Sequence, residues 1–252
     1  MPDVFSDPPV LRTERLVLRP ITESDGEGLF GIFADDQVTE FYAWDRFTDV
    51  GQGHELAART AGKFRQREAI RWGLVLPGAP RIIGTCGYTR WSQENCFALL
   101  GYDLARDYWR RGLMSEAVAA VLRFGFEQMA LHRVEATVLT GNTASAALLG
   151  RAGFQREGVL RERFLKREAF WDVWMFGLTR ADWAAPASRT GSHTGRLDHP
   201  PDSHRHAPDW AGYVHGWIVA GSGSRVARDI LGFCPRFGRG PRKFRDGPQR
   251  LP

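Results

Sequence analysis

The sequence is poor in cysteine and contains no long apolar run. Its three cysteines, Cys86, Cys96 and Cys234, show no metal-ligand spacing, and their odd number does not fit a disulfide framework. Such usage is typical of a reducing compartment. No window reaches the roughly 18 apolar residues of a membrane-spanning helix. The first ten residues, MPDVFSDPPV, lack the basic and apolar parts of a secretory leader. We therefore expect a cytoplasmic protein with no metal and no membrane partner.

Glutamate is absent from residues 186–252, which are dominated by Arg, Gly, Pro, His and Ser. This stretch holds 11 Lys+Arg and 5 Asp, which leaves 23 basic and 24 acidic residues in the rest of the chain. The basic excess behind the isoelectric point of about 9.4 therefore belongs to the tail and not to a folded face. We predict a folded domain over residues 1–185 and a low-complexity basic tail over 186–252, mostly disordered.

Two interpretations of the tail stay open. Its arginines, with Trp210, Tyr213 and Trp217, would suit binding of RNA or DNA through charge and stacking. Alternatively, altered reading of an arginine-rich coding sequence yields the same composition without any function. Nucleic acid is otherwise not expected as a partner.

The body of the chain alternates between strand-like and helix-like patterns. Leu16 and Leu18 alternate with polar positions, as in a half-buried strand, whereas apolar residues between 113 and 129 recur three or four apart. The expected strands span 11–20, 71–76, 81–88, 97–104, 132–140 and 170–178, and the expected helices span 27–33, 50–67, 113–129 and 143–152. This order predicts an α/β fold in which a twisted mixed sheet, containing an antiparallel meander, carries helices on both faces.

Two helix starts carry the chemical signals. In YWRRGLMSEA, residues 108–117, the N–H groups of a helix start point outward together, and such an arrangement binds phosphate oxygens. Gly112 allows close backbone approach, while Arg110 and Arg111 add positive charge. In GNTASAALLGRAGF, residues 141–154, Asn142 and Ser145 stand at the next helix start, where both would also serve as ordinary caps.

Several motifs taken together resemble one family. The segments RLVLRPITESD, IIGTCGY, LGYDLARDYWRRGLMSEAV, LHRVEATVLTGNTASAALLGRAGFQREGVLRE and DVWMFGL follow one another across residues 11–183. In this order they resemble a GNAT-family N-acetyltransferase of the ribosomal-protein-alanine acetyltransferase-like branch. The family's loop pattern is Gln or Arg, two residues, Gly, one residue, then Gly or Ala. Trp109 and Met114 depart from it, although backbone donors do not depend on side-chain identity.

The resemblance implies acetyl-coenzyme A as donor. Its pyrophosphate would bind backbone N–H groups, and its pantetheine arm would lie along a strand; the implied cofactor-binding residues are Tyr102, Asp103, Leu104, Ala105, Arg110, Arg111, Gly112, Leu113, Met114, Ser115, Asn142 and Ser145. Asn142 would bond the pantetheine amide, and Ser145 would help to protonate the departing thiolate. A backbone N–H near Leu104 would stabilise the oxyanion.

The general base is the least defined part of the predicted site. Many relatives carry a Glu where this chain has Leu99, so the carboxylate must come from elsewhere. Glu135, Glu162, Asp103 and the Tyr88 phenol are candidates, and each is also explained as a surface charge or a strand-edge residue. Glu162 is favoured, because GVLRE follows the helix that bears Ser145.

The acceptor is expected to contact residues 35–47, where acidic side chains stand among aromatic ones, a combination that suits a cationic amine. An ordinary solvated loop would explain the same composition. The predicted function is acetyl transfer to a primary amine, either a protein N-terminus or a small amine, by direct attack in a ternary complex. A module that senses acetyl-coenzyme A without turnover is the alternative, and the protein is expected to be a monomer or a homodimer.

Overall fold

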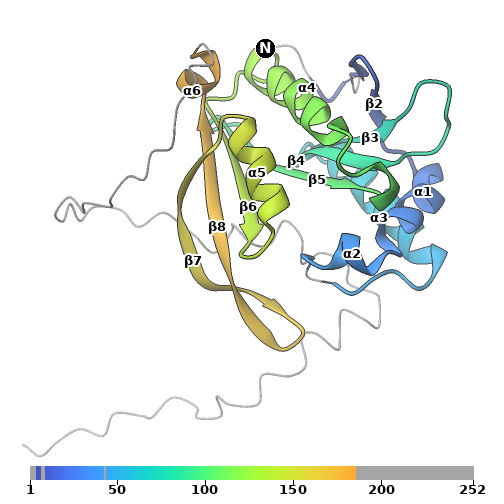
Figure 1. Cartoon of the computed structure of the whole chain (residues 1–252). Coiled ribbons are helices and arrows are strands. Elements are labelled where there is room, and N and C mark those ends of the chain that lie inside the picture. Colours follow the sequence, from blue (N-terminus) through green and yellow to red (C-terminus); the bar gives the residue numbers. More distant parts are fainter. Residues whose placement is uncertain (1–3, 7–8, 43, 186–252) are drawn as a thin grey trace, which may run out of the picture. The chain divides into compact units, whose positions relative to one another are not determined.

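The computed structural model describes residues 4–6, 9–42 and 44–185. The predicted tail, residues 186–252, and Cys234 lie outside these described residues. Eight strands form one sheet in the order β1-β2-β3-β4-β5-β6-β8-β7 (Figure 1). Neighbouring strands are antiparallel except β5 and β6, which are parallel. The sheet is therefore mixed, as the sequence predicts.

The strands are bounded as follows: β1 Leu11–Arg12, β2 Val17–Pro20, β3 Ile70–Val75, β4 Gly84–Ser92, β5 Phe97–Leu104, β6 Arg133–Leu139, β7 Gln155–Lys166 and β8 Ala169–Thr179. The α-helices are α1 Gly26–Phe33, α2 Asp36–Thr39, α3 Val50–Arg65, α4 Leu113–Glu127, α5 Thr143–Arg151 and α6 Arg180–Ala184, with short 3-10 helices η1 Glu23–Asp25 and η2 Arg106–Tyr108. The predicted antiparallel meander corresponds to β3, β4 and β5.

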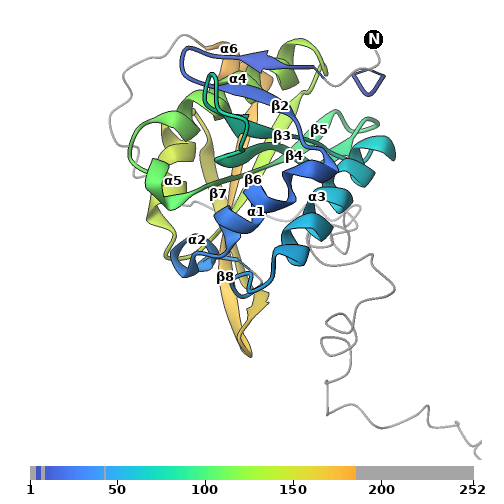
Figure 2. The same ribbon diagram turned by 90° about the vertical axis from the view of Figure 1, so that its right-hand side faces the viewer.

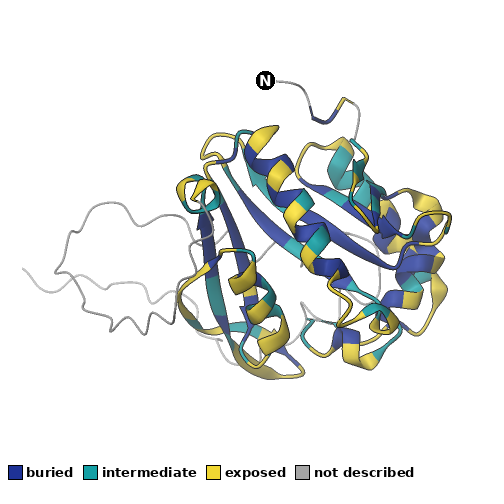
Figure 3. Ribbon diagram, turned by 45° about the horizontal axis from the view of Figure 1, so that its top comes forward, coloured by how far each residue is buried: buried dark blue, intermediate teal, exposed yellow. Residues whose placement is uncertain are grey.

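Helices cover both faces of the sheet (Figures 1 and 2). On one face, Val118 and Val121 of α4 pack with Leu100 of β5 in the larger apolar cluster. On the other face, a second cluster joins α1 and α3 to residues such as Val75. Figure 3 shows the consequence for α4, whose buried stripe faces the sheet while its opposite stripe is exposed; in α5 the one buried residue is Leu149. The apolar side chains of β5 in these clusters, such as Ala98 and Leu100, belong to the larger cluster beneath α4.

The structure corrects the predicted boundaries at both ends of the sheet. The expected strand over 11–20 is a hairpin of two short strands, β1 and β2, and the expected strand over 81–88 begins later and extends to Ser92. Three elements were not predicted: α2, β7 and α6. Most side chains of β7 are exposed, and bulges interrupt its register after Arg156 and after Leu160, so its sequence carries no regular apolar face.

Candidate active site

The parallel pair β5 and β6 separates part-way along its length. Three positions pair, the last being Leu99 with Glu135, after which β5 runs on to Leu104 and β6 to Leu139 without further pairing. The two strands diverge in Figure 1, and α4 and α5 begin shortly after their carboxyl ends. We call this divergence the strand fork. It leaves one backbone edge of β5 without a partner strand beyond Leu99.

The backbone of β5 turns alternate residues toward the fork. Ala105 donates its N–H to the Ile83 carbonyl, next to β4. The backbone N–H and C=O groups of Asp103 and Ala105 therefore point toward β4, whereas those of Tyr102 and Leu104 point toward the fork. The Tyr42 hydroxyl donates to the Tyr102 carbonyl at 3.4 Å, and Trp109 Nε1 donates to the Leu104 carbonyl at 2.7 Å. Of the four predicted pantetheine contacts, Tyr102 and Leu104 are therefore the two oriented for main-chain bonding in the fork.

The loop before α4 adopts an unusual backbone conformation. Arg110 has φ +59° and Gly112 has φ +75°, both in the left-handed region that favours glycine. Gly112 is the N-cap of α4, and no described side chain caps this helix start. The first N–H groups of α4 therefore point out of the helix without a side-chain acceptor, as an anion-binding helix start requires.

Arg15 fixes this loop from the other end of the sequence. Its Nε donates to Glu116 in the first turn of α4 at 2.8 Å, and its Nη1 donates to the Arg111 carbonyl at 2.9 Å. A Cβ atom added at Gly112 would lie 3.4 Å from Arg15 Nη2. No local sequence pattern indicates this role for Arg15, because the residue lies 96 positions before its carbonyl partner.

The start of α5 is capped by its own side chain. The Asn142 Oδ1 accepts the N–H of Ser145 at 3.1 Å, which confirms the capping alternative for this residue. This capping bond occupies Oδ1. The predicted hydrogen bond from Asn142 to a pantetheine amide would therefore have to be donated by Nδ2. Asn142 therefore has a structural role whether or not it also contacts a ligand.

A pair of hydroxyl groups bridges the fork. Tyr102 of β5 and Ser145 of α5 lie 2.6 Å apart, Oη to Oγ. Burial raises the pKa of Tyr102, so its phenol remains protonated at neutral pH. A protonated phenol can donate to Ser145 Oγ and leave the serine proton for a third group. The sequence indicated both residues separately but not their contact.

Two of the candidate bases are enclosed in the protein. Tyr88 is fully buried, and its hydroxyl donates to the Val121 carbonyl of α4 at 2.9 Å. The Asp103 side chain is on the opposite face of the sheet, where it accepts hydrogen bonds from Arg71 and from Thr85 Oγ1. Burial raises the pKa of the Asp103 carboxyl. The Tyr88 hydroxyl thus has its partner within the core, whereas Asp103 Oδ1 is buried without a hydrogen-bond partner among the described residues.

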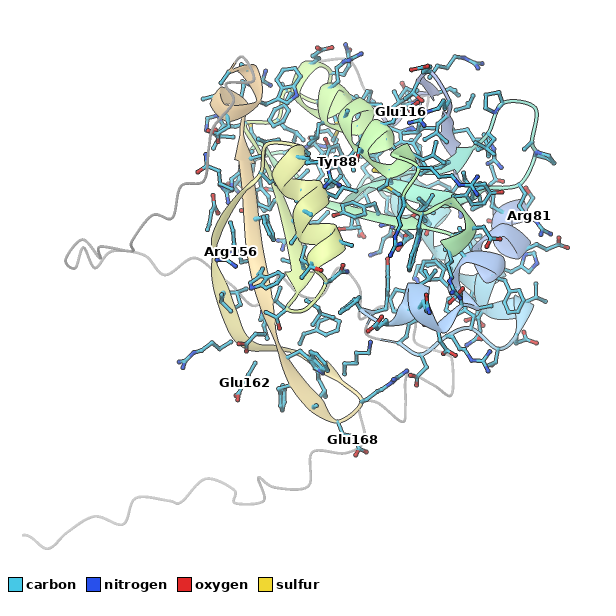
Figure 4. The ribbon with its side chains drawn as sticks, viewed as in Figure 1. Arg81, Tyr88, Glu116, Arg156, Glu162 and Glu168 are labelled. Atoms are coloured by element: carbon cyan, nitrogen blue, oxygen red, sulfur yellow. The ribbon has the colours of Figure 1, made fainter. Side chains whose placement is uncertain are left out.

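The structure does not bring Glu162 and Ser145 together. Glu162 occupies a bulge of β7 with φ +51°, is exposed, and donates its backbone N–H to Asp172 Oδ1 at 2.8 Å. In Figure 4 its side chain lies on the outer side of β7. The sequence expectation was that this carboxylate faces the acceptor; the bulge at this position was not part of that expectation.

Residues 35–47 lie close to the open side of the fork. A Cβ atom added at Gly141, in the β6–α5 connection, would lie 3.7 Å from Phe41, and the Tyr42 hydroxyl reaches β5 as described above. The tip of the β7–β8 hairpin also contacts this segment, since Lys166 Nζ donates to the Thr39 and Glu40 carbonyls. Three chain segments therefore meet where an acceptor is expected.

The carboxylates of this segment already have cationic partners. Asp45 accepts from Arg167 at 3.0 Å, and weaker ion pairs join Asp36 to Arg46 at 3.5 Å and Asp35 to Arg106 at 3.9 Å. Such exposed pairs are screened by solvent. The acidic composition of 35–47 is therefore largely balanced by local arginines, which weakens the sequence argument that this segment attracts a cationic amine.

A cavity of about 500 Å³ lies elsewhere, between the end of β2, α3 and the start of β3. Its lining includes Thr22, Phe64 and Arg71 but none of the residues predicted to hold the donor.

In the described part of the chain, no helix is long and apolar enough to cross a membrane. Residues 4–6, 9–42 and 44–185 also contain no cluster of three or more side chains arranged to hold a metal ion.

Comparison with known proteins identifies the arrangement. A family model described as an acetyltransferase (GNAT) domain matches residues 15–155, which is more than half of the chain. The chain belongs to the GNAT acetyltransferase family. It is thus an acetyltransferase, and the prediction of an enzyme is confirmed at the level of the family.

Two relatives illustrate the similarity of this acetyltransferase to other bacterial enzymes. It is 34% identical over 172 residues to the uncharacterized N-acetyltransferase YoaA of Bacillus subtilis, covering 68% of this chain and 97% of the relative. It is 29% identical over 181 residues to the [ribosomal protein uS5]-alanine N-acetyltransferase of Escherichia coli, covering 69% and 92% respectively. The predicted resemblance to the ribosomal-protein-alanine branch is therefore confirmed.

A solved structure shows the shared fold. The ribosomal L7/L12 alpha-N-protein acetyltransferase RimL, in complex with coenzyme A, aligns with a TM-score of 0.63 and 18% identity over 68% of this chain and 98% of that one. At this identity the likeness shows the fold alone. The GNAT fold predicted from the sequence is confirmed.

Proposed function

We propose that this acetyltransferase moves an acetyl group from acetyl-coenzyme A to a primary amine, a protein N-terminus or a small amine, by direct attack in a ternary complex. The observation that carries the proposal is the strand fork between two helix starts, of which only that of α4 lacks a side-chain cap. An exposed backbone edge beside an anion-binding helix start suits a ligand with an amide-bearing arm and a pyrophosphate.

The donor site follows from this geometry. The pyrophosphate would accept hydrogen bonds from N–H groups between Arg110 and Ser115, with the Arg110 and Arg111 side chains supplying additional charge. The pantetheine arm would extend along the fork-facing edge of β5 at Tyr102 and Leu104. The side chains of Tyr42 and Trp109 donate hydrogen bonds to these two carbonyls. When acetyl-coenzyme A binds, the amide N–H groups of its pantetheine arm would replace them as donors.

The reaction is a nucleophilic substitution at the thioester carbonyl. The amine nitrogen forms a bond to the carbonyl carbon, the negative charge on the oxygen is stabilised by the fork-facing N–H of Leu104, and the carbon–sulfur bond then breaks. Ser145, in contact with Tyr102, would donate a proton to the departing thiolate. The amine must lose a proton to a base. The sequence favoured Glu162 for this role, but that residue is exposed on a bulge of β7.

The uS5-alanine acetyltransferase among the relatives supports peptides with an N-terminal alanine as the first acceptors to examine. We further propose that the folded acetyltransferase domain is residues 1–185, that the protein acts in the cytoplasm, and that it works as a monomer or homodimer.

The test is coenzyme A release by the full chain across N-terminal peptides and small amines, together with calorimetric titration of acetyl-coenzyme A. Saturable donor binding and release with at least one amine are expected. Absence of donor binding would overturn the proposal, and release with a small amine but no peptide would exclude the protein N-terminus as acceptor.

A further inference from the structure

A buried carboxylate, that of Glu135, lies at the vertex of the strand fork. Glu135 pairs with Leu99, the last position at which β5 and β6 remain adjacent. Its neighbours Val134 and Ala136 belong to the core beneath α4, so the Glu135 side chain projects from the opposite face. It is thus at the point where the strands part, on the face away from α4.

One oxygen of this carboxylate lacks a partner. Glu135 is 7% exposed, and its Oε1 accepts a hydrogen bond from Arg133 Nε at 2.8 Å. Its Oε2 is buried and has no hydrogen-bond partner among the described residues. Leaving a buried carboxylate oxygen unsatisfied costs free energy, on the order of 1–3 kcal/mol or more, unless a missing group completes the site.

The neighbouring side chains hold Glu135 in a fixed orientation. Arg133 contacts Glu135 through Nε and Glu157 of β7 through both terminal nitrogens, at 2.8 and 2.5 Å. The Arg133 side chain passes over Gly177 of β8, where an added Cβ would lie 2.5 Å from Arg133 Nη2. The glycine therefore leaves the space that this arrangement needs.

The charges around Glu135 leave a net negative site. Arg133 is shared by two carboxylates, Glu135 and Glu157, and it also interacts electrostatically with Asp182 of α6. Across the fork, Leu99 offers no proton acceptor. The Asp103 carboxylate, further along β5, also has one buried oxygen without a hydrogen-bond partner among the described residues, Oδ1, while its Oδ2 accepts from Arg71 and Thr85. Asp103 belongs to the part of β5 that pairs with β4, whereas Glu135 is at the vertex, where β5 and β6 part.

We propose that Glu135 is the general base of this acetyltransferase, receiving the proton of the attacking amine at Oε2 through one water molecule. As the carbon–nitrogen bond forms, the amine proton passes to the Glu135 carboxylate, while the carbon–sulfur bond breaks and the thiolate takes a proton from Ser145 Oγ, which takes one from the Tyr102 hydroxyl. After the products leave, Glu135 gives its proton to water and Tyr102 regains one from water, so that all three groups return to their starting states. The inference rests on the proposed function and assigns the proton acceptor to β6 instead of to the exposed Glu162 on β7.

Glu135→Gln in the full chain tests the assignment, with Glu162→Gln as a matched control at the other candidate carboxylate. The expected loss of kcat is about 100-fold or more for Glu135→Gln, the scale of general-base catalysis. Calorimetric affinity for acetyl-coenzyme A should be unchanged in both variants. For Glu162→Gln, kcat should remain within about 3-fold of the parent enzyme, because an exposed carboxylate outside the site takes no part in proton transfer.

A purely structural role for Glu135 predicts different readouts. General-base catalysis predicts that the acid limb of kcat against pH disappears in Glu135→Gln, and that acceptors of low amine pKa, already unprotonated at neutral pH, recover most of the rate. A structural role predicts an equal loss of kcat with all acceptors and an unchanged acid limb in the plot of kcat against pH. Should Glu135→Gln fail to fold, Glu135→Asp decides: a shortened base predicts a lower kcat that acceptors of low amine pKa largely restore, whereas a structural role predicts the same loss of kcat with every acceptor.

Failure of the inference and failure of the proposed function are distinguishable. If the parent enzyme releases coenzyme A and Glu135→Gln retains its rate and pH profile, only the base assignment is overturned. If Glu162→Gln instead loses the acid limb, the base lies on β7. If the parent enzyme binds no acetyl-coenzyme A, the proposed function itself is wrong.

Discussion

The two helices that start beside the strand fork differ in whether a side chain accepts hydrogen bonds from the free N–H groups of their first turns. The N-cap of α5 is Asn142, whose side chain accepts the N–H of Ser145. The N-cap of α4 is Gly112, in a left-handed conformation and without a capping side chain among the described residues. Both helices begin with similar partial positive charge from their peptide dipoles. A helix start without its own cap leaves its N–H groups to a ligand, whereas a capped start serves the fold first.

The largest effect expected from this contrast is at Gly112. Gly112→Val should weaken acetyl-coenzyme A binding by about 10-fold or more, because a β-branched residue strongly disfavours a φ of +75° and its side chain would meet Arg15. Calorimetric titration measures the change. Gly78→Val is the matched control, since Gly78 has φ +79° with no atom near an added Cβ and lies in the turn before β4. Equal affinity losses in both variants would mean that backbone strain alone was responsible.

The hydroxyl bridge tests whether the α5 start also takes part in chemistry. Tyr102→Phe should lower kcat by about 10-fold while leaving the affinity for acetyl-coenzyme A unchanged, because Ser145 loses the donor that orients its proton. Ser145→Ala should lower kcat at least as much, and the double variant should add little, since the two hydroxyls act together. Fully additive losses in this double-mutant cycle would show that the two residues act independently.

Asn142 separates capping from ligand contact. Asn142→Ala should lower the free energy of unfolding by about 1 kcal/mol, the usual effect of losing an N-cap. Asn142→Asp keeps the oxygen that accepts the hydrogen bond but loses the Nδ2 group that donates one. It should therefore leave the free energy of unfolding unchanged and weaken the affinity for acetyl-coenzyme A a few-fold. Chemical denaturation and calorimetry measure the two effects. Unchanged affinity in Asn142→Asp would restrict this residue to the cap.

The smallest effect is expected at the arginine side chains before α4. Arg110→Ala or Arg111→Ala should weaken acetyl-coenzyme A binding about 2- to 3-fold, and the difference should fade as salt rises, because exposed charges are screened. Affinity measured at low and high ionic strength checks this. If either variant loses more affinity than Gly112→Val, the side chains and not the backbone N–H groups hold the phosphates.

The sequence predicted most of the fold because its buried elements carry regular apolar patterns. The bounds of β5, Phe97–Leu104, agree with the prediction, and α4 begins at Leu113 as expected. β7 was missed because few of its side chains are buried, so its sequence has no apolar period. For the site, local motifs indicated both helix starts, whereas Arg15 reaches the α4 loop across 96 positions of sequence.

By itself the sequence determined the family, the order of the main elements and the two motifs that border the fork, since these depend on residue types at short spacing. The tertiary structure alone decided which polar groups meet: Arg15 with the Arg111 carbonyl, Tyr102 with Ser145, and Glu135, the cross-strand neighbour of Leu99, with Arg133. It also decided that Glu162 projects from a bulge away from them. Hydrogen bonds form between groups that the folded sheet brings within about 3 Å, and neither register nor bulges are encoded by local spacing.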